Sequence, residues 1–218
     1  MNIQRIEIIP EIILLVFDNQ YDITSTFLRF QEHYESPEFA GKIFTLEEYK
    51  NWYTEEMGSF TYYTDWNGFN IPSYILRPFK TGKFGILSDK ENLLLDLLDY
   101  HEEPFYVIGV HKENLRGFEK TLKHEIAHGL FYTDKDYKDK VLRLLEGRQL
   151  NGLKKFLRES GGYNESVILD ECHAYHISGS KKIDDVLDSD LKESLLELYN
   201  QKLRDKEIVI KKIVDKLL

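Results

Sequence analysis

The segment HEIAH, residues 124–128, limits what this chain can fold into more than any other part of its sequence. Two histidines four residues apart are neighbours on one face of an α-helix, and two imidazole rings at that separation can bind one metal ion through nitrogen. A glutamate that follows the first histidine lies beside such an ion, where it can take a proton from zinc-bound water. We therefore predict a helix that presents His124 and His128 as zinc ligands and Glu125 as a general base.

The residues around this segment predict a helix over 115–132 with two opposed faces. Leu122, Ile126 and Leu130 recur every four residues. At roughly 100° per residue, this apolar row lies roughly 200° from the two histidines. One face of the helix can therefore be buried in a core while the other presents the histidines to a cleft.

A catalytic zinc ion needs a third protein ligand and one open position. The segment ILDECHAYH, residues 168–176, has helical character and contains several candidates. We favour Glu171, because two histidines and one carboxylate leave the metal open to water and substrate. His173 and His176 are rival ligands, although on a helix they point roughly 200° and 140° away from Glu171.

Three neighbours of these residues are candidates for supporting roles. Asp170 is either a hydrogen-bonding partner for a metal-bound imidazole or an exposed acid at the start of a helix. Tyr175 lies four residues after Glu171 and shares its helical face, so its hydroxyl can donate a hydrogen bond to an oxyanion. Tyr132 lies four residues after His128 and is the alternative donor. Either tyrosine can equally be a packing residue.

The order of predicted elements indicates an α+β fold. Before residue 133, strands alternate with helices: a buried strand over 11–17, a helix over 23–34, two further helices that extend to Tyr53 and to Tyr100, and a strand over 105–110. Thr45 and Ser88 are the predicted N-caps of these two helices, and Glu48 stands at the capping-box position after Thr45. After residue 133 the pattern is helical: 137–146, 150–158, 166–178 and 189 to the end. We expect one domain with a small mixed lobe, 1–133, that includes the HEIAH helix, and a mostly helical lobe, 134–218.

The segment 60–79 has no helical period and contains Asn67-Gly68 and two prolines, so we predict a hairpin or structured loop there. Its aromatic residues could line the substrate side of a cleft, but packing into a core is the more common role of such residues. The residues concerned are Tyr62, Tyr63, Trp66 and Phe69.

The composition excludes several classes of protein. A net charge of −9 argues against nucleic acid as a partner. Cys172 is the sole cysteine, which excludes an intramolecular disulfide and a cysteine-based zinc site, and we expect it to be a small buried residue. The apolar run 12–17 is too short to span a bilayer and follows no basic region, so we expect no signal peptide, no membrane partner and a cytoplasmic location.

The HEIAH segment followed by a helix with a glutamate resembles the gluzincins, the zincin metallopeptidases typified by thermolysin. The segment FYVIGV, residues 105–110, resembles the edge strand that lies over their active-site helix and pairs with extended peptide substrate. The resemblance extends from residue 105 to residue 176 and implies a zincin-like fold. It also implies that His124, His128 and Glu171 hold Zn²⁺ and that Glu125 is the base.

The chain departs from the gluzincin pattern in two respects: the gap between the two helices exceeds the thermolysin-like one, and one residue differs. Gluzincins often have an aspartate four residues after the ligand glutamate, supporting the first histidine, and this chain has Tyr175 there. The segment Asp170 to Tyr175 is also similar to that of small bacterial zincin-like proteins.

These observations predict a zinc-dependent metallohydrolase that cleaves peptide bonds in a peptide or protein substrate. Glu125 would move the proton, and Tyr175 or Tyr132 would stabilise the oxyanion. The alternative is a zincin-fold binding or regulatory protein whose activity is lost or confined to one partner, although the retained Glu125 argues against simple loss of catalysis. A purely structural zinc site is disfavoured, because such sites usually have four protein ligands, often cysteines.

Overall fold

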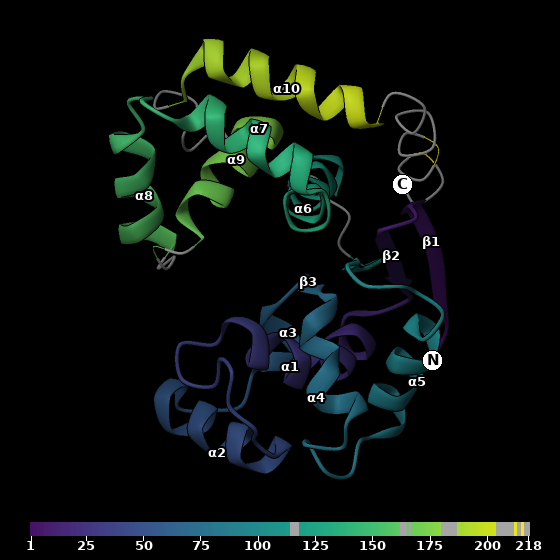
Figure 1. Ribbon diagram of the computed structural model, residues 1–218. Coiled ribbons are helices and arrows are strands. Elements are labelled where there is room, and N and C mark those ends of the chain that lie inside the picture. Colours follow the sequence, from purple (N-terminus) through teal and green to yellow (C-terminus); the bar gives the residue numbers. More distant parts are fainter. Residues whose placement is uncertain are drawn as a thin grey trace. The chain divides into compact units, whose positions relative to one another are not determined.

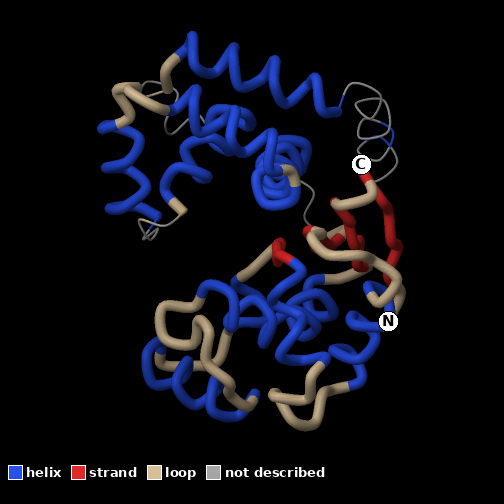
Figure 2. The backbone as a smooth tube through the Cα atoms, in the orientation of Figure 1, coloured by secondary structure: helices blue, strands red, loops and turns tan. Residues whose placement is uncertain are grey.

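A computed structural model describes residues 1–113, 118–161, 165, 167–179, 187–203, 212 and 215. The chain divides into two compact units, Met1–Leu115 and Arg116–Leu218. The first unit combines helices with a four-stranded sheet, and the described part of the second unit consists of helices (Figures 1 and 2). The predicted α+β class is confirmed. The division falls before the HEIAH helix rather than at residue 133, because this helix packs within the helical unit.

The sheet of the first unit has the strand order β1-β2-β4-β3. The strands are β1 (Ile3–Ile9), β2 (Ile12–Phe17), β3 (Gly68–Pro72) and β4 (Tyr106–His111). β1 is antiparallel to β2, β2 is parallel to β4, and β3 is antiparallel to β4. All residues of β2 and β4 are buried, as expected for continuous apolar runs. The strands predicted at 11–17 and 105–110 are confirmed, whereas β1 and β3 were not predicted.

The position of β4 contradicts one expectation drawn from the gluzincin resemblance. β4 lies between β2 and β3 and forms a hydrogen-bonded ladder with each of them. Both of its backbone edges are therefore occupied, and it cannot pair with an extended substrate. The expectation that FYVIGV forms an edge strand is wrong; its unbroken apolar run is that of an inner strand, and the edges of this sheet are β1 and β3.

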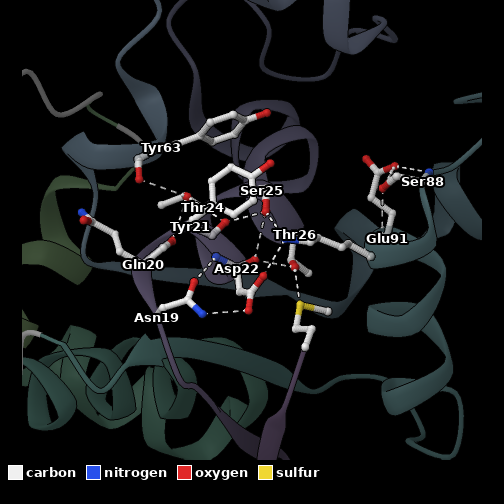
Figure 3. Close-up of polar contacts among 12 residues, drawn as sticks. Asn19, Gln20, Tyr21, Asp22, Thr24, Ser25, Thr26, Tyr63, Ser88 and Glu91 are labelled. Atoms are coloured by element: carbon white, nitrogen blue, oxygen red, sulfur yellow. Dashed lines mark hydrogen bonds and ion pairs between the residues drawn. The ribbon is translucent and has the colours of Figure 1, made fainter.

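Helix α1 (Gln20–Glu35) covers the sheet where β4 contains Gly109. Asn19 caps the helix: its side-chain oxygen accepts from the amide of Asp22 at 2.9 Å, and its side-chain nitrogen donates to the Asp22 carboxylate at 2.9 Å (Figure 3). A Cβ atom added to Gly109 would lie 2.9 Å from the ring of Phe27 and 3.1 Å from the side chain of Ile23. The helix approaches the strand this closely only because position 109 has no side chain.

Two helices of the first unit begin at the predicted caps. α2 (Leu46–Met57) begins after Thr45, and α5 (Asp89–Leu98) begins after Ser88. Each cap forms a reciprocal capping box with the glutamate three residues later, Glu48 and Glu91. Both caps depend only on residues three positions apart, and both predictions are confirmed.

The aromatic segment 60–79 contains a short helix, a strand, a 3-10 turn and another short helix. These are α3 (Tyr62–Asp65), β3, η1 (Ser73–Leu76) and α4 (Arg77–Lys80). The strand pairs with β4 instead of folding back as a hairpin. Tyr62 and Phe69 are buried in the core of the first unit, and Phe69 stacks on Phe27 with ring centroids 5.4 Å apart. The core-packing interpretation is therefore correct for these two residues, whereas Trp66 is half exposed.

The second unit contains five helices in its described part. They are α6 (Phe118–Thr133), α7 (Lys135–Leu145), α8 (Asn151–Gly161), α9 (Ile168–Ser178) and α10 (Ser189–Leu203). Leu122, Ile126 and Leu130 of α6 are 1%, 0% and 2% exposed, which confirms the predicted apolar face. Most of the helix predicted beyond residue 203 lies outside the described residues. None of the helices in the described part of the chain has the length and apolar character needed to cross a bilayer.

A buried ion pair joins α1 to α5. The guanidinium of Arg29 donates from Nε to Glu91 Oε1 at 2.6 Å and from Nη2 to Oε2 at 2.7 Å, and these side chains are 7% and 6% exposed. The same Glu91 carboxylate accepts from the backbone and hydroxyl of Ser88 (Figure 3). Burial raises the pKa of Glu91, but the hydrogen bonds from Arg29 and Ser88 outweigh it and hold the pKa below its usual value.

We predict that Gly109→Ala destabilises the first unit by about 1–3 kcal/mol, because the new methyl group displaces the ring of Phe27 from a packed interior. Urea unfolding followed by tryptophan fluorescence measures this, since both tryptophans, Trp52 and Trp66, belong to the first unit. Gly68→Ala is the matched control, because its Cβ would meet only a carbonyl oxygen at 3.4 Å. Equal stability of the two variants would contradict the close approach of α1 to β4.

Glu91→Gln should destabilise the first unit by about 3 kcal/mol at pH 7, because it leaves the buried Arg29 without a counter-charge while a glutamine retains the cap. The pKa of Glu91 is lower in the folded chain than in the unfolded chain, where it is about 4.3. Its contribution is therefore complete above the unfolded pKa and is lost as the pH falls through the folded pKa. Urea midpoints of wild type and variant should converge in acid; a constant difference down to pH 2 would refute this account.

Candidate metal centre

Two histidines of α6 and one glutamate of α9 converge in the second unit. Nε2 of His124 lies 3.1 Å from Nε2 of His128. The Glu171 carboxylate lies 3.6 Å from Nε2 of His124 and 3.4 Å from Nε2 of His128. One ligand atom from each residue falls within 4.8 Å of the others, which is close enough to bind one metal ion. The structure therefore brings together the three ligands that the sequence predicted.

The other ring nitrogen of each histidine is occupied by a hydrogen bond. Nδ1 of His128 lies 2.9 Å from the carboxylate of Asp170, and Nδ1 of His124 lies 3.3 Å from the hydroxyl of Ser178. Ser178 donates its own proton to the carbonyl of Ala174 at 3.0 Å, so its oxygen is free to accept from His124. With an N–H at Nδ1, each ring directs the lone pair of Nε2 into the cluster, as metal-binding histidines do.

The charges of this cluster favour a cation. Burial lowers the pKa of His128, but the neighbouring Asp170 carboxylate more than compensates and raises it to about 10. Burial raises the pKa of Asp170, but His128 outweighs it and holds the pKa at about 2. A proton on Nε2 of His128 thus balances the surrounding carboxylates, and a divalent ion at the same place would take over that role.

Three carboxylate oxygens of the cluster are buried without a hydrogen-bond donor among the described residues. They are Oε2 of Glu171, Oε2 of Glu125 and Oδ1 of Asp170. Burying a charged oxygen without a partner is costly, and a bound cation removes that cost. Two Nε2 lone pairs 3.1 Å apart also repel each other unless a proton or a cation lies between them. The residues present therefore fit a metal ion.

Glu125 and Tyr175 lie beside the three ligand residues. Burial raises the pKa of the Glu125 carboxyl, and the two histidines counteract that rise only in part. A carboxylate with a raised pKa is a better proton acceptor than an exposed one. The ring of Tyr175 meets the ring of His124 edge-on, with centroids 4.8 Å apart. Tyr132 is half-buried in the last turn of α6.

The rival ligands, His173 and His176, use both ring nitrogens elsewhere. Nε2 of His173 lies 2.8 Å from the hydroxyl of Tyr137, and Nδ1 faces the Asp170 carboxylate at 3.5 Å. Nδ1 of His176 donates to the carbonyl of Cys172 at 2.6 Å, and Nε2 accepts from the amide of Asp188 at 3.3 Å. Neither histidine belongs to the ligand cluster.

Cys172 is free and fully buried, as predicted. Burial raises the pKa of its thiol to about 11, so it stays protonated.

Three polar residues form contacts with the histidines of α6 and α9. The sequence analysis did not name Ser178 or Tyr137, and it considered Asp170 as one of two alternatives. Ser178 lies seven residues after Glu171, two helical turns along the same face, so the spacing contained a usable signal. Asp170 was weighed as a partner for an imidazole, and the structure places it against His128. Tyr137 has no local signal, because its contact with His173 joins two helices 36 residues apart.

Comparison of the chain with protein-family models, with curated proteins and with solved structures found no match. The function is therefore argued from the geometry of the cluster.

We predict that Glu171→Gln lowers the affinity for zinc by more than about 100-fold. This is a larger loss than the substitution of a residue that only hydrogen-bonds to a ligand would cause. His176→Asn should leave the affinity unchanged, because both nitrogens of His176 have partners outside the cluster and asparagine retains an N–H for the carbonyl of Cys172. Competition with a chromophoric chelator measures both. Zinc bound tightly by the Glu171 variant and weakly by the His176 variant would reverse the assignment of the third ligand.

Proposed function

We propose that this protein is a zinc-dependent hydrolase of the metallopeptidase type. One observation carries the proposal: Nε2 of His124 and Nε2 of His128 converge with the Glu171 carboxylate while both Nδ1 atoms have hydrogen-bonding partners. Two imidazoles and one carboxylate are a donor set of catalytic zinc, whereas calcium and magnesium prefer oxygen ligands throughout. Three protein ligands also leave a coordination position for substrate and water.

A bound zinc ion would supply Lewis acidity that polarises a carbonyl group and lowers the pKa of water. The chain itself supplies the proton acceptor. Oε2 of Glu125 is buried, has no donor among the described residues, and belongs to a carboxyl whose pKa is raised by burial. In this proposal it takes a proton from the attacking water and passes it to the leaving amine nitrogen.

Tyr175 is the residue we assign to the oxyanion. It comes from the same helix as Glu171, and its ring contacts that of His124. A phenolic O–H beside the ligand cluster can donate to the oxygen on which charge develops. Peptide bonds are proposed as the substrate because the HEIAH segment and the later glutamate helix resemble those of gluzincins.

We predict that Glu125→Gln retains zinc and fold but lowers cleavage of a peptide library by about 100-fold or more, because the amide cannot accept the proton. Cleavage is followed by mass spectrometry and zinc by elemental analysis of the same samples. Wild type treated with chelator and then resupplied with zinc is the positive control. Undiminished activity in the variant would remove Glu125 as the base. Zinc-loaded wild type that cleaves nothing would favour the binding or regulatory alternative.

A further inference from the structure

The polar groups behind His128 continue into the interior of the second unit. Oδ2 of Asp170 takes the Nδ1–H of His128, and Oδ1 of Asp170 faces Nδ1 of His173 at 3.5 Å. Both of these last two atoms are buried and lack a hydrogen-bond partner among the described residues, so each faces the other at a distance longer than an ordinary hydrogen bond. Nε2 of His173 lies 2.8 Å from the hydroxyl of Tyr137. The buried polar chain Tyr137–His173–Asp170–His128 thus links α7 to α6 through α9.

One assignment of protons places a donor opposite an acceptor at every contact of the buried polar chain. Asp170 is charged and can only accept, so both histidines must present N–H from Nδ1. Nε2 of His173 is then a lone pair and accepts the proton of the Tyr137 hydroxyl. The opposite tautomer of His173 would place a lone pair against a buried carboxylate, with no water to relieve the repulsion.

Packing holds the imidazole of His173 in this orientation. His173 and Tyr137 are each 0% exposed. The His173 ring stacks on Phe131 of α6 with centroids 5.7 Å apart, and it meets the ring of Tyr137 edge-on at 5.5 Å. An apolar side chain would fill this space without needing polar partners. His173 instead directs Nδ1 toward Asp170, the partner of His128, and Nε2 toward the hydroxyl of Tyr137.

We propose that Tyr137 and His173 are positioning residues of the metal centre. They hold the Asp170 carboxylate in place, and Asp170 in turn fixes the Nδ1–H tautomer and the orientation of His128. Groups that orient a metal-binding imidazole raise its affinity for metal, and their loss lowers that affinity about 10- to 100-fold. This inference depends on the metal site of the proposed function but not on its hydrolytic activity.

The test is the zinc affinity of the full chain, measured by competition with a chromophoric chelator. Tyr137→Phe removes only the hydroxyl that ends the buried polar chain, and we expect it to weaken zinc about 10-fold, the lower end of the range for outer partners. Tyr53→Phe is the matched control, because it removes a buried tyrosine hydroxyl that donates to Asp65 in the first unit, outside the metal centre. It should leave the affinity unchanged. Thermal unfolding of the chelator-treated variants measures any general loss of stability.

Two substitutions of His173 separate positioning from packing. An asparagine amide nitrogen can lie near the former Nδ1 and donate to Asp170, whereas a glutamine amide reaches toward the former Nε2. His173→Asn keeps a donor to Asp170 but loses the contact with Tyr137, so we expect it to weaken zinc about as much as Tyr137→Phe does. His173→Gln loses the donor to Asp170, and we expect it to weaken zinc further, toward about 100-fold. In zinc-loaded protein, the Nδ1 proton of His128 should exchange with solvent faster in His173→Gln and Tyr137→Phe than in wild type, as seen by nitrogen-edited NMR.

The outcomes distinguish this inference from the proposed function. Zinc binding that is absent in wild type, or equal in wild type and His128→Ala, would remove the metal site and the inference with it. Zinc bound by wild type and lost in His128→Ala, with Tyr137→Phe and His173→Gln both binding as tightly as Tyr53→Phe, would overturn the positioning role alone. An affinity loss that follows unfolding temperature equally across all variants, Tyr53→Phe included, would also overturn it.

Discussion

His128 and Asp170 bring an imidazole and a carboxylate to 2.9 Å between two helices, where most of both side chains is shielded from water. Removing two charges from water costs several kcal/mol per ion, and such a pair contributes more to the uniqueness of a packing arrangement than to its stability. The pair fixes α9 against α6 in rotation and in register. Glu171 is the next residue, roughly 100° further around the helix, so the same register that satisfies Asp170 brings Glu171 to both Nε2 atoms.

The first unit contains a second buried ion pair, and comparison of the two explains why only one suggests a metal. Arg29 and Glu91 form two hydrogen bonds and neutralise each other, and Ser88 satisfies the rest of the carboxylate. In the second unit, three carboxylates surround two imidazoles, and one oxygen of each carboxylate lacks a donor among the described residues. A complete pair leaves no unmatched charge, whereas an excess of buried negative charge favours a cation, either a proton or a metal ion.

The features that could be predicted from sequence depend on neighbours within one or two helical turns. The caps at Thr45 and Ser88 and the opposed faces of α6 are of this kind. The place of a strand within its sheet could not be predicted in this way, because it depends on which distant segments pair with the strand. β3 comes from an aromatic segment with no strand pattern, yet its pairing turns β4 from the expected edge strand into an inner one. For the same reason, the sequence does not predict the contact between Tyr137 and His173, which lie 36 residues apart.

The four histidines of α6 and α9 show how a metal ligand can be recognised among buried imidazoles. Burial does not separate them, since His173 and His176 are the most deeply buried of the four. The direction of Nε2 does separate them. Nε2 of His173 faces the Tyr137 hydroxyl and Nε2 of His176 accepts from the amide of Asp188, whereas Nε2 of His124 and Nε2 of His128 face each other and Glu171. An imidazole held at one nitrogen, with the other facing a carboxylate and a second imidazole, is oriented for a ligand that the chain itself does not supply. That distinction arises from packing between helices. Helical spacing alone predicts that His124 and His128 lie together, but it leaves His173 and His176 open as rivals.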